Sequence, residues 1–465
     1  GANTEGDGNT ALGMNALYSN TTADNNTGVG TSALQTNSTG ANNIAVGMNS
    51  LFSNTTASSN VAVGRNAMYV NTTGHSNVAI GDEALKANST GSENTAVGYQ
   101  ALDAATTADN NTAIGRLAVT TGENNVLMGT DAGTALTTGG SNVAIGKDAF
   151  AVATTTSQTV AIGWKALSNA TGTGNTAVGY AAGEDVSTAV QNTFLGYHAG
   201  TNLTTSNNNV FVGYGAGDAC TTGTPNIAIG VGAYGANTGG AENTAIGHSA
   251  LALCDSGSFY NTAVGSTAGY DLTTGDYNVF VGRYAGTSVE SGSLNICIGA
   301  SSRPSAISGS HQIVMGYNVT GSGDSTFTFG NSGSDTTCSM GGTTWSNPSD
   351  ERIKQDIKDE VIGLGFINEL RPVTFQYRKE KDIPEELDAH VADSEEHLIS
   401  DEYQHGFIAQ EVKQTIDKHG FKDGFDMWSE DPKDGRQRVG ETALIPMLVK
   451  AIQELSAEVE KLKGE

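Results

Sequence analysis

The chain of 465 residues has little proline and few aromatic residues. Proline accounts for 7 residues and aromatic residues for 6%. Disordered low-complexity chains are usually richer in proline and charge, so this composition does not indicate disorder. Collagen is excluded because its triple helix needs glycine at every third position, and the 61 glycines do not follow that period.

Long apolar runs and metal-binding motifs are missing too. No run approaches the roughly 20 apolar residues of a membrane-spanning helix. The four cysteines form no C-x-x-C pair and the eight histidines are scattered, so we predict no metal site and no cofactor. The chain shows no signal peptide and begins at Gly1, so we expect it to be trimmed from a longer one.

Charge is unevenly distributed along the chain. Only 7 of the 23 Lys and Arg and 21 of the 49 Asp and Glu residues precede Ser349. This step predicts a domain boundary, with a repetitive shaft over 1–330, a connector over 331–348 and a separate domain over 349–465. Both parts are acidic, which argues against nucleic acid and anionic membranes as partners.

A repeat of the form Asn-x-x-(Ile/Val/Leu)-Gly dominates the shaft. It occurs as Asn43-Ile-Ala-Val-Gly47 and Asn226-Ile-Ala-Ile-Gly230, among nineteen copies. The closing glycines recur every seventeen residues from Gly13 to Gly115, and the period continues with small variations to Gly316. Such a period is the signature of a solenoid, in which each repeat forms one rung.

Each repeat suggests its own local structure. Three alternating, often β-branched residues predict a short strand, and glycine then permits a bend. An apolar pair such as Ala166-Leu167 predicts a second short strand, and a turn rich in Thr, Gly, Asn and Asp closes the rung. We therefore predict a mostly β fold, a parallel β-solenoid or β-roll. Asparagines stacked rung on rung predict a structural hydrogen-bond ladder, formed by Asn9, Asn26, Asn43, Asn60, Asn77, Asn94, Asn111 and their equivalents.

The cysteines Cys220 and Cys254 occupy one register, two repeats apart. At about 4.8 Å per rung they lie about 9.6 Å apart, beyond disulfide reach. We therefore expect both cysteines to be buried and to act as small hydrophobic residues.

Rungs this thin bury only three or four apolar side chains each. Three columns packed side by side would cover the remaining apolar residues, which predicts a homotrimer. The repeats resemble the head repeats of trimeric autotransporter adhesins and repeats of some phage tail fibres, which form trimeric β-rolls. The period here is longer than that of the adhesin heads.

The last segment predicts a small α+β domain that ends in a helix. Apolar residues recur there at heptad spacing, which predicts a coiled coil over about 441–464; packing of the same helix on its own domain is the alternative. The seam residues are Ile445, Leu448, Ile452, Leu455, Val459 and Leu462.

Three motifs carry a second resemblance: Ser349-Asp-Glu-Arg-Ile-Lys354, Gly406-Phe-Ile-Ala-Gln-Glu411 and the stretch 441–455. In this order they resemble the intramolecular chaperone domain of phage endosialidases and tail fibres. The resemblance implies that the domain trimerises, guides folding of the shaft and is released by self-cleavage. It implies Ser349 as the nucleophile, Lys354 as the base and Pro348–Ser349 as the scissile bond.

The chemistry of this pair makes sense from the residues. A serine hydroxyl needs a base, and lysine serves only when its pKa falls from about 10.4 toward 7 or 8. Arg352 is a candidate cation for this effect, and Gln410 and Glu411 are candidate supporting residues. Residues five apart on a helix do not meet, so either Ser349 precedes the helix or Lys354 acts from a neighbouring protomer. A plain helix N-cap role for Ser349 is the non-catalytic alternative.

We therefore expect a virion tail-fibre shaft with a self-releasing chaperone, assembled in the host cytoplasm and then extracellular. Its expected partners are its own copies, upstream fibre or tail proteins, and a host cell-surface glycan or protein. Alternatives are a trimeric surface adhesin that keeps its C-terminal domain and a glycan-degrading tailspike.

Overall fold

The structure, a computed structural model, describes residues 3–118, 120–255, 257–421 and 426–464. The chain divides into two compact units, Gly1–Pro348 and Ser349–Glu465. Each unit has its own apolar core.

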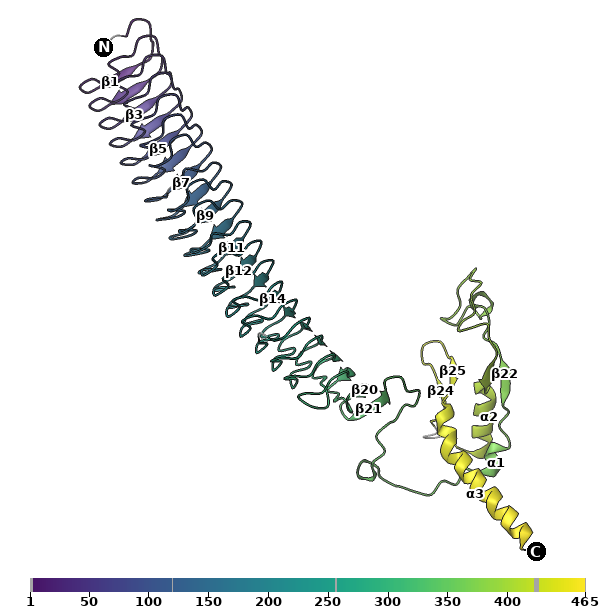
Figure 1. The fold of residues 1–465 in the computed structure, drawn as a ribbon. Coiled ribbons are helices and arrows are strands. Elements are labelled where there is room, and N and C mark those ends of the chain that lie inside the picture. Colours follow the sequence, from purple (N-terminus) through teal and green to yellow (C-terminus); the bar gives the residue numbers. More distant parts are fainter. Residues whose placement is uncertain (1–2, 119, 256, 422–425, 465) are drawn as a thin grey trace. The chain divides into compact units, whose positions relative to one another are not determined.

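The first unit is a β-solenoid of about nineteen turns, in which each repeat contributes one strand (Figure 1). Successive strands pair in parallel and in register, so that Thr10 lies beside Thr27 and Ala11 beside Gly28. The strands are β1 Thr10–Leu12, β2 Thr27–Val29, β3 Ile44–Val46, β4 Val61–Val63, β5 Val78–Ile80, β6 Thr95–Val97, β7 Thr112–Ile114, β8 Val126–Met128, β9 Val143–Ile145, β10 Val160–Ile162, β11 Thr176–Val178, β12 Thr193–Leu195, β13 Val210–Val212, β14 Ile227–Ile229, β15 Thr244–Ile246, β16 Thr262–Val264, β17 Val279–Val281, β18 Ile296–Ile298, β19 Ile313–Tyr317, β20 Thr326–Asn331 and β21 Ser334–Ser339, the last antiparallel to β20.

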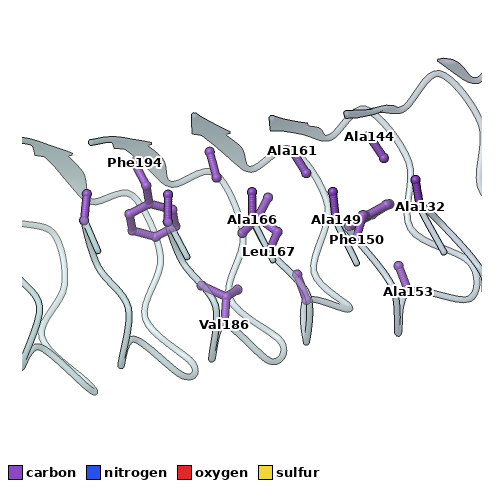
Figure 2. Packing of buried hydrophobic residues seen from close by; sticks show 14 of the residues in the cluster. Ala132, Ala144, Ala149, Phe150, Ala153, Ala161, Ala166, Leu167, Val186 and Phe194 are labelled. Carbon is purple, nitrogen blue, oxygen red and sulfur yellow. The ribbon is translucent and has the colours of Figure 1, made fainter. Parts of the chain in front are cut away.

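The predicted alternation is confirmed in the strands from β2 to β18. In β3, Ala45 is buried whereas Ile44 and Val46 point outward. On the other side of each rung the apolar pair closes the core, as Ala166 and Leu167 do opposite Ala161 (Figure 2). The core is therefore one layer of side chains between the strands and the turns.

The second strand predicted for each repeat is wrong. The apolar pair lies in a turn, because its second residue has a left-handed backbone, with φ +51° at Leu34 and +50° at Leu167. Such a residue interrupts an extended chain. The turns still bond rung to rung: the Leu34 N–H donates to the Ser50 carbonyl at 3.0 Å.

The predicted asparagines do lie one above another. The Asn9 side-chain oxygen accepts the backbone N–H of Asn26 at 2.9 Å, and the Asn26 amide group donates to the Gly40 carbonyl at 2.9 Å. Bonds between two side chains also occur, as from Asn77 to Asn60 at 3.2 Å. Each asparagine thus ties its own rung to the backbone of the neighbouring rungs.

The four cysteines are free and buried. Burial raises the pKa of the Cys220 and Cys254 thiols to about 11 and that of Cys297 to about 12. These thiols therefore stay protonated at neutral pH, and the expectation of small buried hydrophobic residues is confirmed.

Among its described residues, the second unit has three helices and two pairs of short antiparallel strands (Figure 1). The helices are α1 Leu364–Ile367, α2 Ala409–His419 and α3 Leu444–Lys463, with single 3-10 turns η1 Glu351–Ile353, η2 Glu380–Asp382 and η3 Glu441–Ala443. Strand β22 Val373–Phe375 pairs with β23 Gln404–Gly406, and β24 Trp428–Glu430 with β25 Gln437–Val439, both antiparallel. The buried core of this unit consists of Phe366, Val412, Ile416, Met427, Leu444 and Met447.

Candidate functional site

The predicted dyad lies in the first residues of the second unit. Asp350 caps the turn η1, because its side chain accepts the backbone N–H of Arg352 at 2.8 Å. Ser349 precedes the cap, and Lys354 follows the turn with an extended backbone. Ser349 is therefore not the N-cap, and the non-catalytic alternative in that form is wrong.

Ser349 and Lys354 contact each other directly. The Lys354 Nζ donates to the Ser349 Oγ at 2.6 Å. A full helix would place residues five apart on different sides, but one 3-10 turn between two extended residues folds the chain back. The pairing is thus available within one chain, with Ser349 before the helical turn.

Solvent surrounds this pair in the single chain. Every residue from 341 to 359 is exposed. A lysine acts as a base only in its neutral form, which burial favours. The single chain therefore supplies the contact between Ser349 and Lys354 but not the burial.

The other predicted site residues lie in separate contacts. Arg352 pairs with Asp350, with Nε 2.9 Å from Oδ1, and this hydrogen bond lowers the pKa of the Asp350 carboxyl. Glu411, in the first turn of α2, accepts from Arg371 Nε at 2.8 Å, which lowers the pKa of Glu411. The guanidinium of Arg352 is thus neutralised by its neighbour rather than directed at the lysine.

Gln410 lines a surface hollow of about 430 Å³ together with Phe407, Arg438 and Glu441. Among the hydrogen bonds of the described residues, neither Gln410 nor Glu411 reaches the Ser349 and Lys354 side chains. The structure therefore places the Gly406–Glu411 motif around β23 and α2, apart from the dyad's own contacts.

Helix α3 has two apolar faces. Leu444, Met447 and Ala451 are buried against the unit's own core. The predicted seam is exposed instead, from 39% at Val459 to 74% at Leu462. The helix thus packs on its own domain and still presents a free heptad stripe: Ile445, Leu448, Ile452, Leu455, Val459 and Leu462.

Several residues that stabilise the structure were not predicted from the sequence. A second buried asparagine ladder runs along the turn side, where Asn37 donates to Asn20 at 3.0 Å and Asn54 to Asn37 at 2.8 Å. Its signal was visible, since Asn20, Asn37, Asn54, Asn71 and Asn88 share the seventeen-residue period. The Glu454 carboxylate accepts the N–H of Leu364 at 2.8 Å and so caps α1 from α3; no local pattern predicts this pairing.

Within 3–118, 120–255, 257–421 and 426–464, no three His, Cys, Asp or Glu side chains are grouped so that they could hold a metal ion. In the same ranges, no helix has the length and apolar character to cross a membrane.

Residues 349–421 match a family model described as "Chaperone of endosialidase". The C-terminal unit is thus similar to these self-cleaving intramolecular chaperones. The match to the endosialidase chaperones begins at Ser349, the residue at which the second compact unit begins. A β-solenoid followed by an endosialidase-type chaperone unit fits a tail fibre with a C-terminal chaperone domain. No curated protein matches the chain in sequence.

Proposed function

We propose that the chain is a homotrimeric phage tail-fibre shaft whose C-terminal unit drives assembly and then cuts itself off at the Pro348–Ser349 bond. One observation carries this proposal: the bond from Lys354 Nζ to Ser349 Oγ, placed where the unit boundary and the chaperone match both begin. The mature fibre would be a virion component that joins upstream tail proteins and contacts a host-surface glycan or protein.

The proposed reaction uses only these side chains and water. Neutral Lys354 takes the proton of the Ser349 hydroxyl, and Oγ attacks the carbonyl carbon of Pro348. The C–N bond breaks, the amine of Ser349 takes up the proton, and an ester to Oγ remains. Water then hydrolyses the ester, which leaves a carboxylate on Pro348 and frees the hydroxyl. A conventional attack on the Pro348 carbonyl, in which an oxyanion hole stabilises the tetrahedral intermediate, gives the same products.

Trimer assembly is proposed to complete the site. The free seam of α3 has the spacing of a coiled coil, and its association would bring three copies of the dyad segment near other protomers. Cover from a neighbour would remove water from Lys354 and favour its neutral form. Cutting then follows assembly, so that an unassembled chain keeps its chaperone.

The mass of the denatured protein shows whether the chain has been cut. We compare wild type with Ser349→Ala, Lys354→Met and the control Ser346→Ala, which changes an exposed serine three residues before the cut. We expect fragments ending at Pro348 and starting at Ser349 in wild type and control, and whole chains in the other two. Whole wild-type chains in an assembled oligomer would contradict self-cleavage and favour a surface protein that keeps its chaperone. Degradation of a host glycan by the purified shaft would instead favour a tailspike.

A further inference from the structure

Four consecutive rungs carry an aromatic residue directly after the closing glycine of the strand. These residues are Trp164, Tyr180, Tyr197 and Tyr214, and we call them the aromatic stack. Their rings stack from rung to rung, with centroids 4.6, 4.9 and 5.1 Å apart along the series and planes within 20° of parallel. The last ring, Tyr214, is 60% exposed.

The fold does not require an aromatic residue at this position. Other rungs carry Met14, Arg65, Asp82 or Lys147 there, so the solenoid forms with apolar, basic and acidic side chains alike. Exposed apolar side chains that gather on one surface usually mark an interaction site. Stacking also holds Tyr214 in place before any ligand arrives, which lowers the entropy cost of binding.

The rung that follows Tyr214 leaves space beside the end of the aromatic stack. It continues with the smaller Val231 and with Gly232, whose N–H donates to the Tyr214 carbonyl at 2.9 Å. A Cβ on Gly232 would meet nothing closer than the Ser249 Oγ at 3.7 Å. The left-handed backbone does not demand glycine, because Asn66 and Ser249 have φ +55° and +51° at the same position. This rung therefore lacks a side chain that other rungs have.

A carboxylate lies over the same rung. The Oδ1 of Asp218 is 3.6 Å from the place of a Cβ on Gly235, a position that holds Tyr69 in another rung. Burial raises the pKa of the Asp218 carboxyl, and the nearby His198 imidazole acts in the opposite direction. A carboxylate is a hydrogen-bond acceptor for hydroxyl groups. One rung thus offers two bare positions, an aromatic ring and an acceptor.

We infer that Tyr214, Asp218 and the bare rung at Gly232 bind one pyranose ring of a neutral glycan. The hydrogens on one face of a pyranose carry partial positive charge and are attracted by the negative face of an aromatic ring. The carboxylate accepts hydrogen bonds from the sugar hydroxyls. A cation also binds an aromatic face, but a protonated His198 beside Asp218 repels it. The inference rests on the proposed function, because it names the site through which the fibre contacts a host glycan.

Saturation-transfer NMR on the full chain tests this site with the methyl glycosides of glucose, galactose, mannose and N-acetylglucosamine. We expect at least one of them to bind wild type, and Tyr214→Ala to weaken this binding at least about fivefold because the stacking surface is lost. Gly232→Asn fills the bare position in a conformation that Asn66 already adopts, and the same loss is expected. The control Tyr99→Ala removes a ring that is 49% exposed at the equivalent position of another rung, and binding is expected to stay unchanged.

Each outcome decides a different claim. No saturation transfer to any of the four glycosides would overturn the inference and leave the proposed self-cleavage intact. An equal loss in Tyr99→Ala would show general adsorption to exposed rings and overturn the site. A signal from tetramethylammonium that depends on Tyr214, without one from any glycoside, would assign the place to a cation instead. Uncut wild-type chains that still bind a glycoside through Tyr214 would refute the proposed cutting and leave the inference standing.

Discussion

At the residue scale, many rungs of the core place one large side chain at either of two positions. In several rungs the middle strand residue is alanine and a leucine follows six residues later, as with Ala161 and Leu167. Where it is phenylalanine, as in Phe211, glycine takes that later position, as in Gly217. A Cβ on Gly217 would come within 2.6 Å of the Phe211 ring. The two residues therefore share one volume.

This exchange predicts a compensated pair of substitutions. Phe211→Ala leaves a cavity and is expected to lower the free energy of local unfolding by about 3–5 kcal/mol. Phe211→Ala combined with Gly217→Leu recreates the alanine–leucine rung and is expected to recover most of this loss. Hydrogen exchange of the β13 amides measures both effects. Equal protection in the single and double variants would contradict the shared volume.

At the element scale, the closing glycines set how closely the rungs stack. Gly163 has φ +137°, and a Cβ there would lie 2.2 Å from the carbonyl oxygen of Gly179 in the next rung. Gly174 also has a left-handed backbone, with φ +73°, but a Cβ there would come no closer than 3.6 Å, to the Gln191 side chain. A comparison of the two glycines therefore distinguishes the cost of a left-handed backbone from the cost of a close contact between rungs.

Alanine substitution at the two glycines measures the difference. Gly174→Ala is expected to cost about 1–2 kcal/mol through its left-handed backbone. Gly163→Ala is expected to cost about 1–3 kcal/mol more, because the added methyl forces two rungs apart. Denaturant unfolding followed by circular dichroism compares the two variants. A smaller loss for Gly163→Ala than for Gly174→Ala would show that the stacking contact relaxes freely.

At the scale of the whole molecule, the proposed cutting reaction depends on assembly. Ile452→Asp places a charge on the exposed seam of α3 and leaves the buried residues of that helix and the dyad unchanged. We expect this variant to lose the trimer and to cut at least about tenfold more slowly, because desolvation of the lysine is lost. The control Ser456→Asp changes an exposed residue of the same helix outside the seam.

Mass in solution and the rate of fragment formation are measured on the same samples. Full-rate cutting by monomeric Ile452→Asp would show that one chain completes its own site. Slow cutting by the control would show that charge on α3, rather than seam contact, is responsible.

The sequence determined the solenoid, because its information is local and periodic. A glycine every seventeen residues fixes the bends, and one inward residue per strand, such as Ala45, fixes the register. The same holds for the Asn9 ladder and for the heptad stripe of α3. The motif around Ser349 could be recognised in the sequence because its residues lie next to one another.

Only the tertiary structure decided the rest. The left-handed backbone at Leu34 replaced an expected strand with a turn, because rung stacking rather than strand propensity sets that conformation. The meeting of Ser349 and Lys354 depends on one short 3-10 turn, whose length no periodicity signals. The capping of α1 by Glu454 joins residues ninety positions apart. Such contacts arise from the packing of distant segments, and local sequence carries no signal for them.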